Sequence, residues 1–123
     1  MGWSDSHLHS FNIGEDVYML DDGELEDDEI DESEASVLEA LDGVKTFTYE
    51  YDFGDSWIHE VIVEDQRWVE EALEHAVCLD GENACPPEDC GGPEGYKDLQ
   101  VAGPGLHPTS FDLVAINLAL RRL

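Results

Sequence analysis

The sequence predicts an α+β fold, in which a mainly antiparallel sheet with a central hairpin is joined to a Cys/Pro/Gly-rich loop and a C-terminal helix. Residues 45–53 alternate aromatic with polar side chains, a pattern typical of a half-buried strand. All three cysteines and three of the five prolines fall within residues 78–96, where little helix or strand is expected. Residues 110–123 carry leucine and isoleucine at helical spacing. A chain of 123 residues is expected to form one domain, residues 1–123.

The first third of the chain predicts two short strands, an acidic loop and a short helix. Residues 3–13 alternate as a strand does, and residues 18–20 form a short apolar run. Most of residues 14–36 is too acidic and too poor in apolar side chains to be buried, so a solvated loop is expected. Residues 35–41 favour one or two helical turns. The expected cap is Ser33 or Ser36, and the expected stop is Gly43.

The central hairpin is the clearest local prediction. The aromatic side chains of its first strand share one face and should point at the core; they are Phe47, Tyr49, Tyr51 and Phe53. Gly54 and Asp55 suit a two-residue turn before a return strand over residues 56–64. That register sets Asp52 opposite Trp57 and Glu50 opposite His59. We therefore expect His59 to share a face with two acids and Trp57.

Two helices are expected in the second half of the chain. Residues 66–77 repeat apolar pairs every four residues, which indicates an amphipathic helix leading into Cys78. A glycine- and proline-rich link over residues 101–110 then precedes the final helix. Thr109 or Ser110 is its expected cap, and Arg121 and Arg122 suit its C-terminal dipole.

The charge of the chain limits its partners. Its 31 acidic and 5 basic residues give a net charge of −26. Direct binding to nucleic acid is not expected, because phosphate contacts require clustered lysine and arginine. A surface with so much acid and so little lysine is typical of a protein that stays soluble in concentrated salt, where self-repulsion is screened. A basic protein partner is the other interpretation of the charge.

The expected cellular setting is the cytoplasm. The chain contains no run of about 18 apolar residues and no basic, apolar leader, so neither a membrane span nor a secretory signal is predicted. Three cysteines cannot form a complete set of disulfides, which favours a reducing compartment.

Four segments together resemble one known family. They are GWSDSHLHSF at residues 2–11, YEYDFGDSWIHEV at 49–61, CLDGENACPPEDCGGPEGY at 78–96 and SFDLVAIN at 110–117. In this order they are similar to the plasmid pRiA4b ORF-3-like family, some members of which are described as TnpR-type passenger proteins of insertion elements. The resemblance implies an α+β domain with a mainly antiparallel sheet and an association with mobile elements. It implies no established activity.

The chain departs from the pattern of this family at two places. Members usually carry a strand and a helix ahead of the junction that here occupies residues 2–9, so we expect an N-terminally truncated domain. The loss of those elements would expose a sheet edge and favour pairing with a protein partner or self-association. The link near residues 101–109 also looks shortened.

The cysteine-rich loop predicts a structural zinc site. Its proposed ligands are Cys78, Cys85, Cys90 and His59. Zinc prefers four soft or borderline ligands, and a loop without regular hydrogen bonds is often ordered by such an ion. His7 or His9 is an alternative to His59 as the fourth ligand. The other interpretation is that Cys78 is a buried small side chain and that Cys85 and Cys90 bind no metal.

The preferred function is a non-enzymatic, protein-interacting accessory domain. The alternative is a metal-dependent, hydrolase-like enzyme centred on His59 and the neighbouring acids Glu50, Asp52 and Asp55. No nucleophile or phosphate-binding motif supports the enzyme. A third possibility is that the proline-rich part of the cysteine loop is a recognition surface, carried by Pro86, Pro87, Asp89 and Tyr96.

Overall fold

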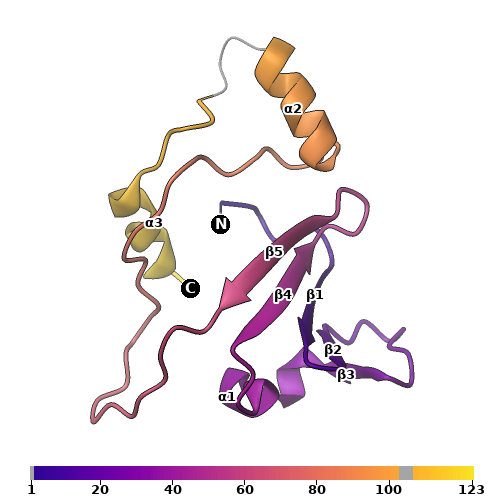
Figure 1. Cartoon of the computed structure of the whole chain (residues 1–123), viewed down its shortest axis with the longest axis vertical. Coiled ribbons are helices and arrows are strands. Elements are labelled where there is room, and N and C mark those ends of the chain that lie inside the picture. Colours follow the sequence, from indigo (N-terminus) through magenta and orange to yellow (C-terminus); the bar gives the residue numbers. More distant parts are fainter. Residues whose placement is uncertain (1, 103–106) are drawn as a thin grey trace. The chain divides into compact units, whose positions relative to one another are not determined.

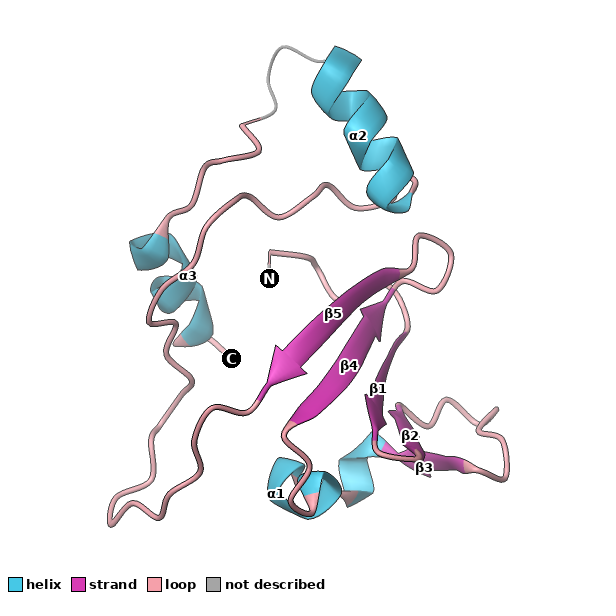
Figure 2. Cartoon of the chain, in the orientation of Figure 1, coloured by secondary structure: helices cyan, strands magenta, loops and turns pink. Residues whose placement is uncertain are grey.

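The computed structural model describes residues 2–102 and 107–123, which fall into two compact units (Figure 1). The sheet unit comprises residues 5–66, and the loop–helix unit comprises the described residues of 1–4 and 67–123. All the described strands, magenta in Figure 2, belong to the sheet unit, whereas α2 and α3 belong to the loop–helix unit. The predicted α+β class is therefore confirmed. Part of the link that looked shortened lies outside the described residues.

The sheet has five described strands in the order β3-β2-β1-β4-β5. They are β1 His9–Ile13, β2 Asp16–Met19, β3 Glu29–Asp31, β4 Thr46–Tyr51 and β5 Trp57–Ile62. β2 and β3 run parallel, and every other neighbouring pair is antiparallel. The acidic stretch expected to be a loop contains β3, because Ile30 pairs with Tyr18 and adds an apolar side chain beside the core.

The core lies between one sheet face and the short helix α1, Val37–Leu41. Ile13, Tyr18 and Leu41 are its most buried members. Partly buried side chains pack around them: Phe11, Ile30, Ala35, Ala40, Val44, Phe47 and Val63. The aromatic face of the predicted hairpin therefore does point at the core, except at Phe53, which is 41% exposed because β4 ends at Tyr51.

Ser36, one of the two predicted caps, is the N-cap of α1. Its hydroxyl accepts a hydrogen bond from the backbone N–H of Glu39, and the Glu39 carboxylate accepts one from the Ser36 N–H, which completes a capping box. The helix ends at Leu41, as predicted; its C-cap Asp42 adopts a left-handed conformation with φ 41°, and Gly43 follows at φ 85°.

The predicted register of the hairpin is wrong by one residue. Tyr51 pairs with Trp57 and Tyr49 pairs with His59, so the connection has five residues, 52–56, instead of two. The cause lies at Asp52, which turns to φ 57° and accepts hydrogen bonds from the N–H groups of Gly54 and Asp55. This turn ends β4 early. It places His59 on the aromatic face and leaves Glu50 on the opposite face.

The described residues of the loop–helix unit form two helices, α2 Gly92–Ala102 and α3 Leu113–Leu120. The prediction of a helix over residues 66–77 is wrong, since that segment has no helical turn. An isolated helix of about 12 residues is marginal in water unless its apolar face packs. Here Trp68 is 95% exposed and Leu73 is 78% exposed, so no such packing exists.

The sequence does not predict helix α2, because the glycines and the proline at its start are typical of a loop. Proline at the first turn of a helix is favourable, and Glu94 and Lys97 form an ion pair at 2.8 Å along α2.

The C-terminal helix is confirmed, but its cap is Asp112 instead of Thr109 or Ser110. The Asp112 carboxylate accepts a hydrogen bond from the Ala115 N–H at 2.9 Å. Within the described residues, no helix is both long enough and apolar enough to cross a membrane.

Candidate functional site

A row of histidine and tyrosine rings crosses three strands on the core face of the sheet unit. β1 supplies His9, β4 supplies Tyr49 and β5 supplies His59. The centre of the Tyr49 ring lies 5.7 Å from that of His9 and 5.5 Å from that of His59. Strand alternation explains the row, since Phe11 pairs with Tyr49 and Tyr49 pairs with His59 across the ladder.

His9 is held by carboxylates on both of its ring nitrogens. Its Nε2 lies 2.8 Å and 3.0 Å from the two oxygens of Glu32, and its Nδ1 lies 3.8 Å from an oxygen of Asp5. The His9 and Glu32 side chains are only 16% and 23% exposed, whereas that of Asp5 is 81% exposed. The contact with Glu32 is therefore the stronger of the two, because solvent screens the exposed pair.

The surroundings of Tyr49 change the pKa of its side chain. Burial raises the pKa of its phenol above the usual value near 10, and the nearby Asp5, Tyr51 and Glu32 raise this pKa further. The phenol of Tyr49 therefore keeps its proton to a higher pH than a fully exposed tyrosine does.

A second contact, between His7 and Asp52, lies at the start of the hairpin connection. Their side chains approach to 3.6 Å between Nε2 and Oδ2, and the His7 ring meets Tyr51 edge-on. Asp52 is only 7% exposed, and its other oxygen accepts the turn hydrogen bonds. The Tyr51 hydroxyl accepts a hydrogen bond from the Ser6 N–H at 3.2 Å.

The acid/base cluster predicted around His59 does not assemble. The Nδ1 atom of His59 forms a hydrogen bond with the backbone carbonyl of Tyr49 at 3.1 Å. Glu50 accepts a hydrogen bond from the Ser56 hydroxyl. Asp52 lies near His7 instead, and Asp55 contributes a backbone N–H to the turn. The one-residue difference in register separates the groups that the enzyme hypothesis needs on one face.

The cysteine loop belongs to the loop–helix unit and is tied down by side chains. The Trp3 indole donates to the Pro86 carbonyl at 2.8 Å, and Glu88 accepts hydrogen bonds from both the N–H and the hydroxyl of Ser4. Its first residue, Cys78, is held by Asn117 of α3. These contacts order a backbone that has no regular secondary structure between residues 78 and 91.

The three thiols each lie near a carbonyl oxygen of a residue that follows closely. The distances are 3.3 Å from Cys78 to Asp80, 3.5 Å from Cys85 to Pro86 and 3.9 Å from Cys90 to Gly92. No disulfide joins these three cysteines, and their sulfurs do not all lie within 4.8 Å of one another. His59, the fourth predicted ligand, belongs to the sheet unit.

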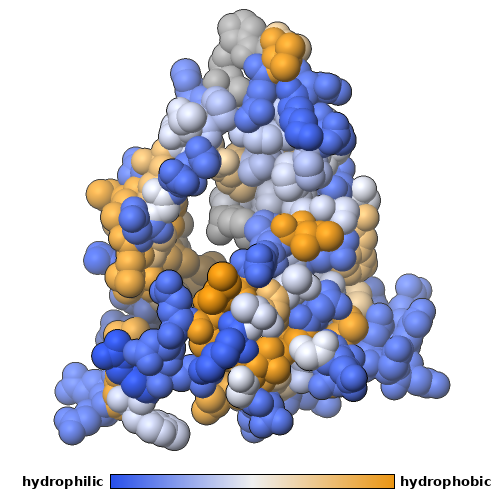
Figure 3. Space-filling view, in the orientation of Figure 1, coloured by the Kyte–Doolittle hydropathy of each residue, from blue (hydrophilic) through white to orange (hydrophobic). Residues whose placement is uncertain are grey.

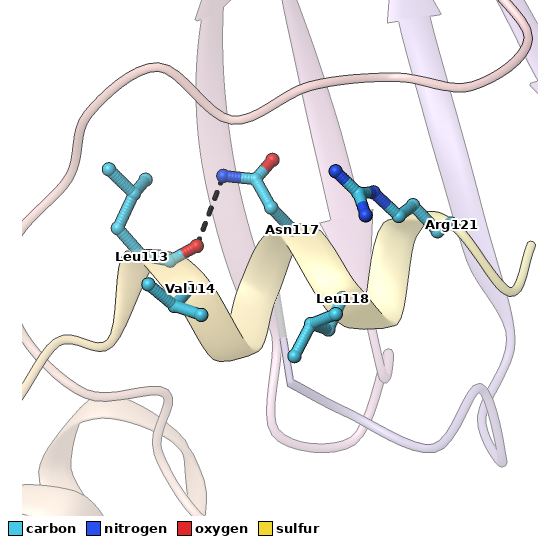
Figure 4. A pocket seen from close by; sticks show the side chains of 5 residues that line it. All are labelled: Leu113, Val114, Asn117, Leu118 and Arg121. Atoms are coloured by element: carbon cyan, nitrogen blue, oxygen red, sulfur yellow. Dashed lines mark hydrogen bonds between the residues drawn. The ribbon is translucent and has the colours of Figure 1, made fainter.

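Helix α3 presents an apolar surface of its own. Figure 3 shows this region in orange, and Val114 and Leu118 are 71% and 48% exposed. A shallow groove of about 320 Å³ runs along this surface. Figure 4 shows its lining residues, which all come from the one helix or its C-cap: Leu113, Val114, Asn117, Leu118 and Arg121.

The fold and these sites define an α+β protein with a five-stranded, mostly antiparallel sheet and a cysteine-containing loop. The sequence matches the profile of the plasmid pRiA4b ORF-3-like proteins over residues 1–108, so the chain belongs to that family. It is 40% identical over 101 residues to the uncharacterized protein y4hQ of Sinorhizobium fredii (strain NBRC 101917 / NGR234). That match covers 80% of this chain and 52% of y4hQ, so the chain spans about half the length of this relative.

A solved structure shares the fold. The crystal structure of MM3350, a protein of unknown function from Methanosarcina mazei Go1, matches with a TM-score of 0.76 and 27% sequence identity. The match covers 94% of this chain and 75% of MM3350. The match to the family profile confirms the family resemblance of the sequence.

Proposed function

We propose that this chain is a non-enzymatic accessory domain that binds a protein partner by adding the partner's strand to the edge of β5. The observation that carries the proposal is that β5, among the described strands, has a neighbour on one side only. An edge strand presents backbone N–H and C=O groups to any extended chain, and several recognition domains use such an edge.

The ladder identifies the residues that face outward. Val63 donates its N–H to the carbonyl of Lys45. Because hydrogen bonding alternates along an antiparallel pair, residues 57, 59 and 61 also bond to β4, whereas residues 58, 60 and 62 direct their backbone groups away from it. The edge has neither proline nor lysine, the residues that commonly protect such edges.

The side chains at these positions favour a partner of one kind. Ile58 and Ile62 are 66% and 61% exposed, with exposed Glu60 between them on the same face. Cross-strand neighbours interact directly, so a matching strand would carry apolar residues opposite the isoleucines and a basic residue opposite Glu60. A second copy of this chain is a weaker partner at low salt, because two chains of charge −26 repel each other.

The proposed cellular setting follows from composition and family. The excess of acid supports a salt-adapted cytoplasm, and the family name supports an association with plasmids or other mobile elements. A protein partner reconciles that association with a surface that does not suit direct contact with DNA.

Peptide binding tests the proposed edge. A synthetic strand with valine, lysine and valine at alternate positions should bind the chain, and the same strand with glutamate for lysine should bind at least about tenfold more weakly. Glu60→Pro removes the outward N–H without touching the ladder to β4 and should abolish binding of both peptides. The matched control Glu60→Thr keeps the N–H and should bind both peptides equally. Unchanged binding by Glu60→Pro, or a peptide-independent dimer in sedimentation, contradicts the proposal.

A further inference from the structure

A partly open cavity of about 270 Å³ lies within the sheet unit, between α1 and the core face of the sheet. Its lining comes from β1, β2, β4 and the segment around α1. The residues are Phe11, Ile13, Tyr18, Glu32, Ala35, Ser36, Val37, Ala40 and Phe47. The volume lies just below the range typical of small-molecule sites, so it suits a ligand smaller than a drug-sized molecule.

The lining is apolar apart from a few groups. Aromatic rings of Phe11 and Phe47 contribute from adjacent strands, with ring centres 6.5 Å apart, and Ala40 leaves room beside them. Glu32 is the single carboxylate of the lining, and none of the lining residues is a lysine or an arginine. An apolar wall with one charged group is the arrangement that orients an amphiphilic ligand.

The chemistry at Glu32 determines the sign of the ligand charge. The Glu32 side chain is about three-quarters buried. Its two carboxylate oxygens lie 2.8 Å and 3.0 Å from Nε2 of His9. A carboxylate in this position accepts hydrogen bonds from donors, above all from cationic ones. The rest of the unit adds to this preference, because Lys45 is the only lysine or arginine among residues 5–66. An anionic head group would be repelled.

We propose that this cavity binds a small apolar amine, with its ammonium group at the Glu32 carboxylate beside His9 and its hydrocarbon against Phe11 and Phe47. This site is separate from the β5 edge and does not depend on the function proposed for it. The hydrocarbon gains from leaving water, and the head group gains a charge-assisted hydrogen bond at a partly buried acceptor.

The test uses the full chain and three probes of one length: n-hexylamine, n-hexanol and n-hexanoate. Binding is followed by NMR titration at one fixed ionic strength, with the shifts mapped to residues. Hexylamine should perturb Phe11, Ala40 and Phe47 and bind at least about tenfold more tightly than hexanol. Hexanoate should not bind. Equal binding of the three probes, or no binding of hexylamine, overturns the proposal.

Three variants locate the site. Glu32→Gln should weaken hexylamine binding to the level of hexanol, whereas Glu34→Gln, an exposed charge change two residues away, should leave it unchanged. Ala40→Phe fills the cavity and keeps Glu32, so it should abolish binding of both hexylamine and hexanol. Hexylamine binding that survives in folded Ala40→Phe would place the ligand elsewhere and overturn the proposal.

Discussion

The side-chain amide of Asn117 satisfies both backbone groups of Cys78. Its Oδ1 accepts the Cys78 N–H at 2.9 Å, and its Nδ2 donates to the Cys78 carbonyl at 2.9 Å and to the Leu113 carbonyl at 3.0 Å. The amide thus takes the place of a neighbouring strand for the first residue of the cysteine loop. A single side chain of α3 thereby anchors a segment 39 residues away in the sequence.

Replacement of Asn117 should destabilise the loop–helix unit. Asn117→Ala leaves the N–H and carbonyl of Cys78 without their protein partner, which should cost about 1–3 kcal/mol in the free energy of unfolding. Asn117→Asp keeps the size and the acceptor but loses the donor, so it should also destabilise. Urea denaturation measures both, with Leu118→Ala as the control on the exposed side of α3. An Asn117→Ala variant as stable as the control would contradict the anchor.

Gly95 allows the first turn of α2 to close against Cys90. A Cβ atom at residue 95 would overlap the carbonyl oxygen of Cys90. Alanine is intrinsically the better helix former by about 1 kcal/mol, but the overlap forces a backbone shift that costs about 1–3 kcal/mol. We therefore expect Gly95→Ala to lower stability and helix content, measured by urea denaturation and circular dichroism. Asp98→Ala, in the same helix, is the control. A stabilised Gly95→Ala protein would disprove the close approach.

The raised pKa of Tyr49 predicts a loss of stability in alkali. Because the folded state holds the phenol proton more tightly than the unfolded state, the stabilisation is complete below the unfolded pKa near 10 and is lost as pH rises through the folded value. Tyr49→Phe should remove this part of the alkaline decline, whereas Tyr96→Phe, in the other unit, should not. Unfolding free energies at pH 8 and pH 11 measure the difference. An identical decline in Tyr49→Phe and the unmodified chain would refute the assignment.

The proposed structural zinc site makes a prediction about the thiols of the cysteine loop. Zinc binding by Cys78, Cys85 and Cys90 would turn their sulfurs away from the carbonyl oxygens they now approach. Native mass spectrometry of protein purified without a chelator or histidine tag should then show one zinc ion per chain, lost in Cys90→Ser. A metal-free, folded chain with three titratable thiols would reject the zinc site.

Several parts of the fold were predictable because their signals are local. The alternation in residues 45–53 and the capping box of Ser36 and Glu39 depend on side chains within a few residues of each other. The C-terminal helix was predictable for the same reason. The helix expected over residues 66–77 failed, because a periodic pattern forms a stable helix only where a surface receives its apolar face.

The amino-acid sequence by itself determined the α+β class, the aromatic strand and the family, and it narrowed the cap of α1 to Ser33 or Ser36. Only the tertiary structure decided which polar groups meet. Asp52 ends β4 through its own turn, and this shift of one residue moves His59 from the predicted acidic face to the side of Tyr49. The pairing of His9 with Glu32 and of Cys78 with Asn117 joins segments 23 and 39 residues apart. Such contacts depend on how strands align and pack, and no local pattern encodes that alignment.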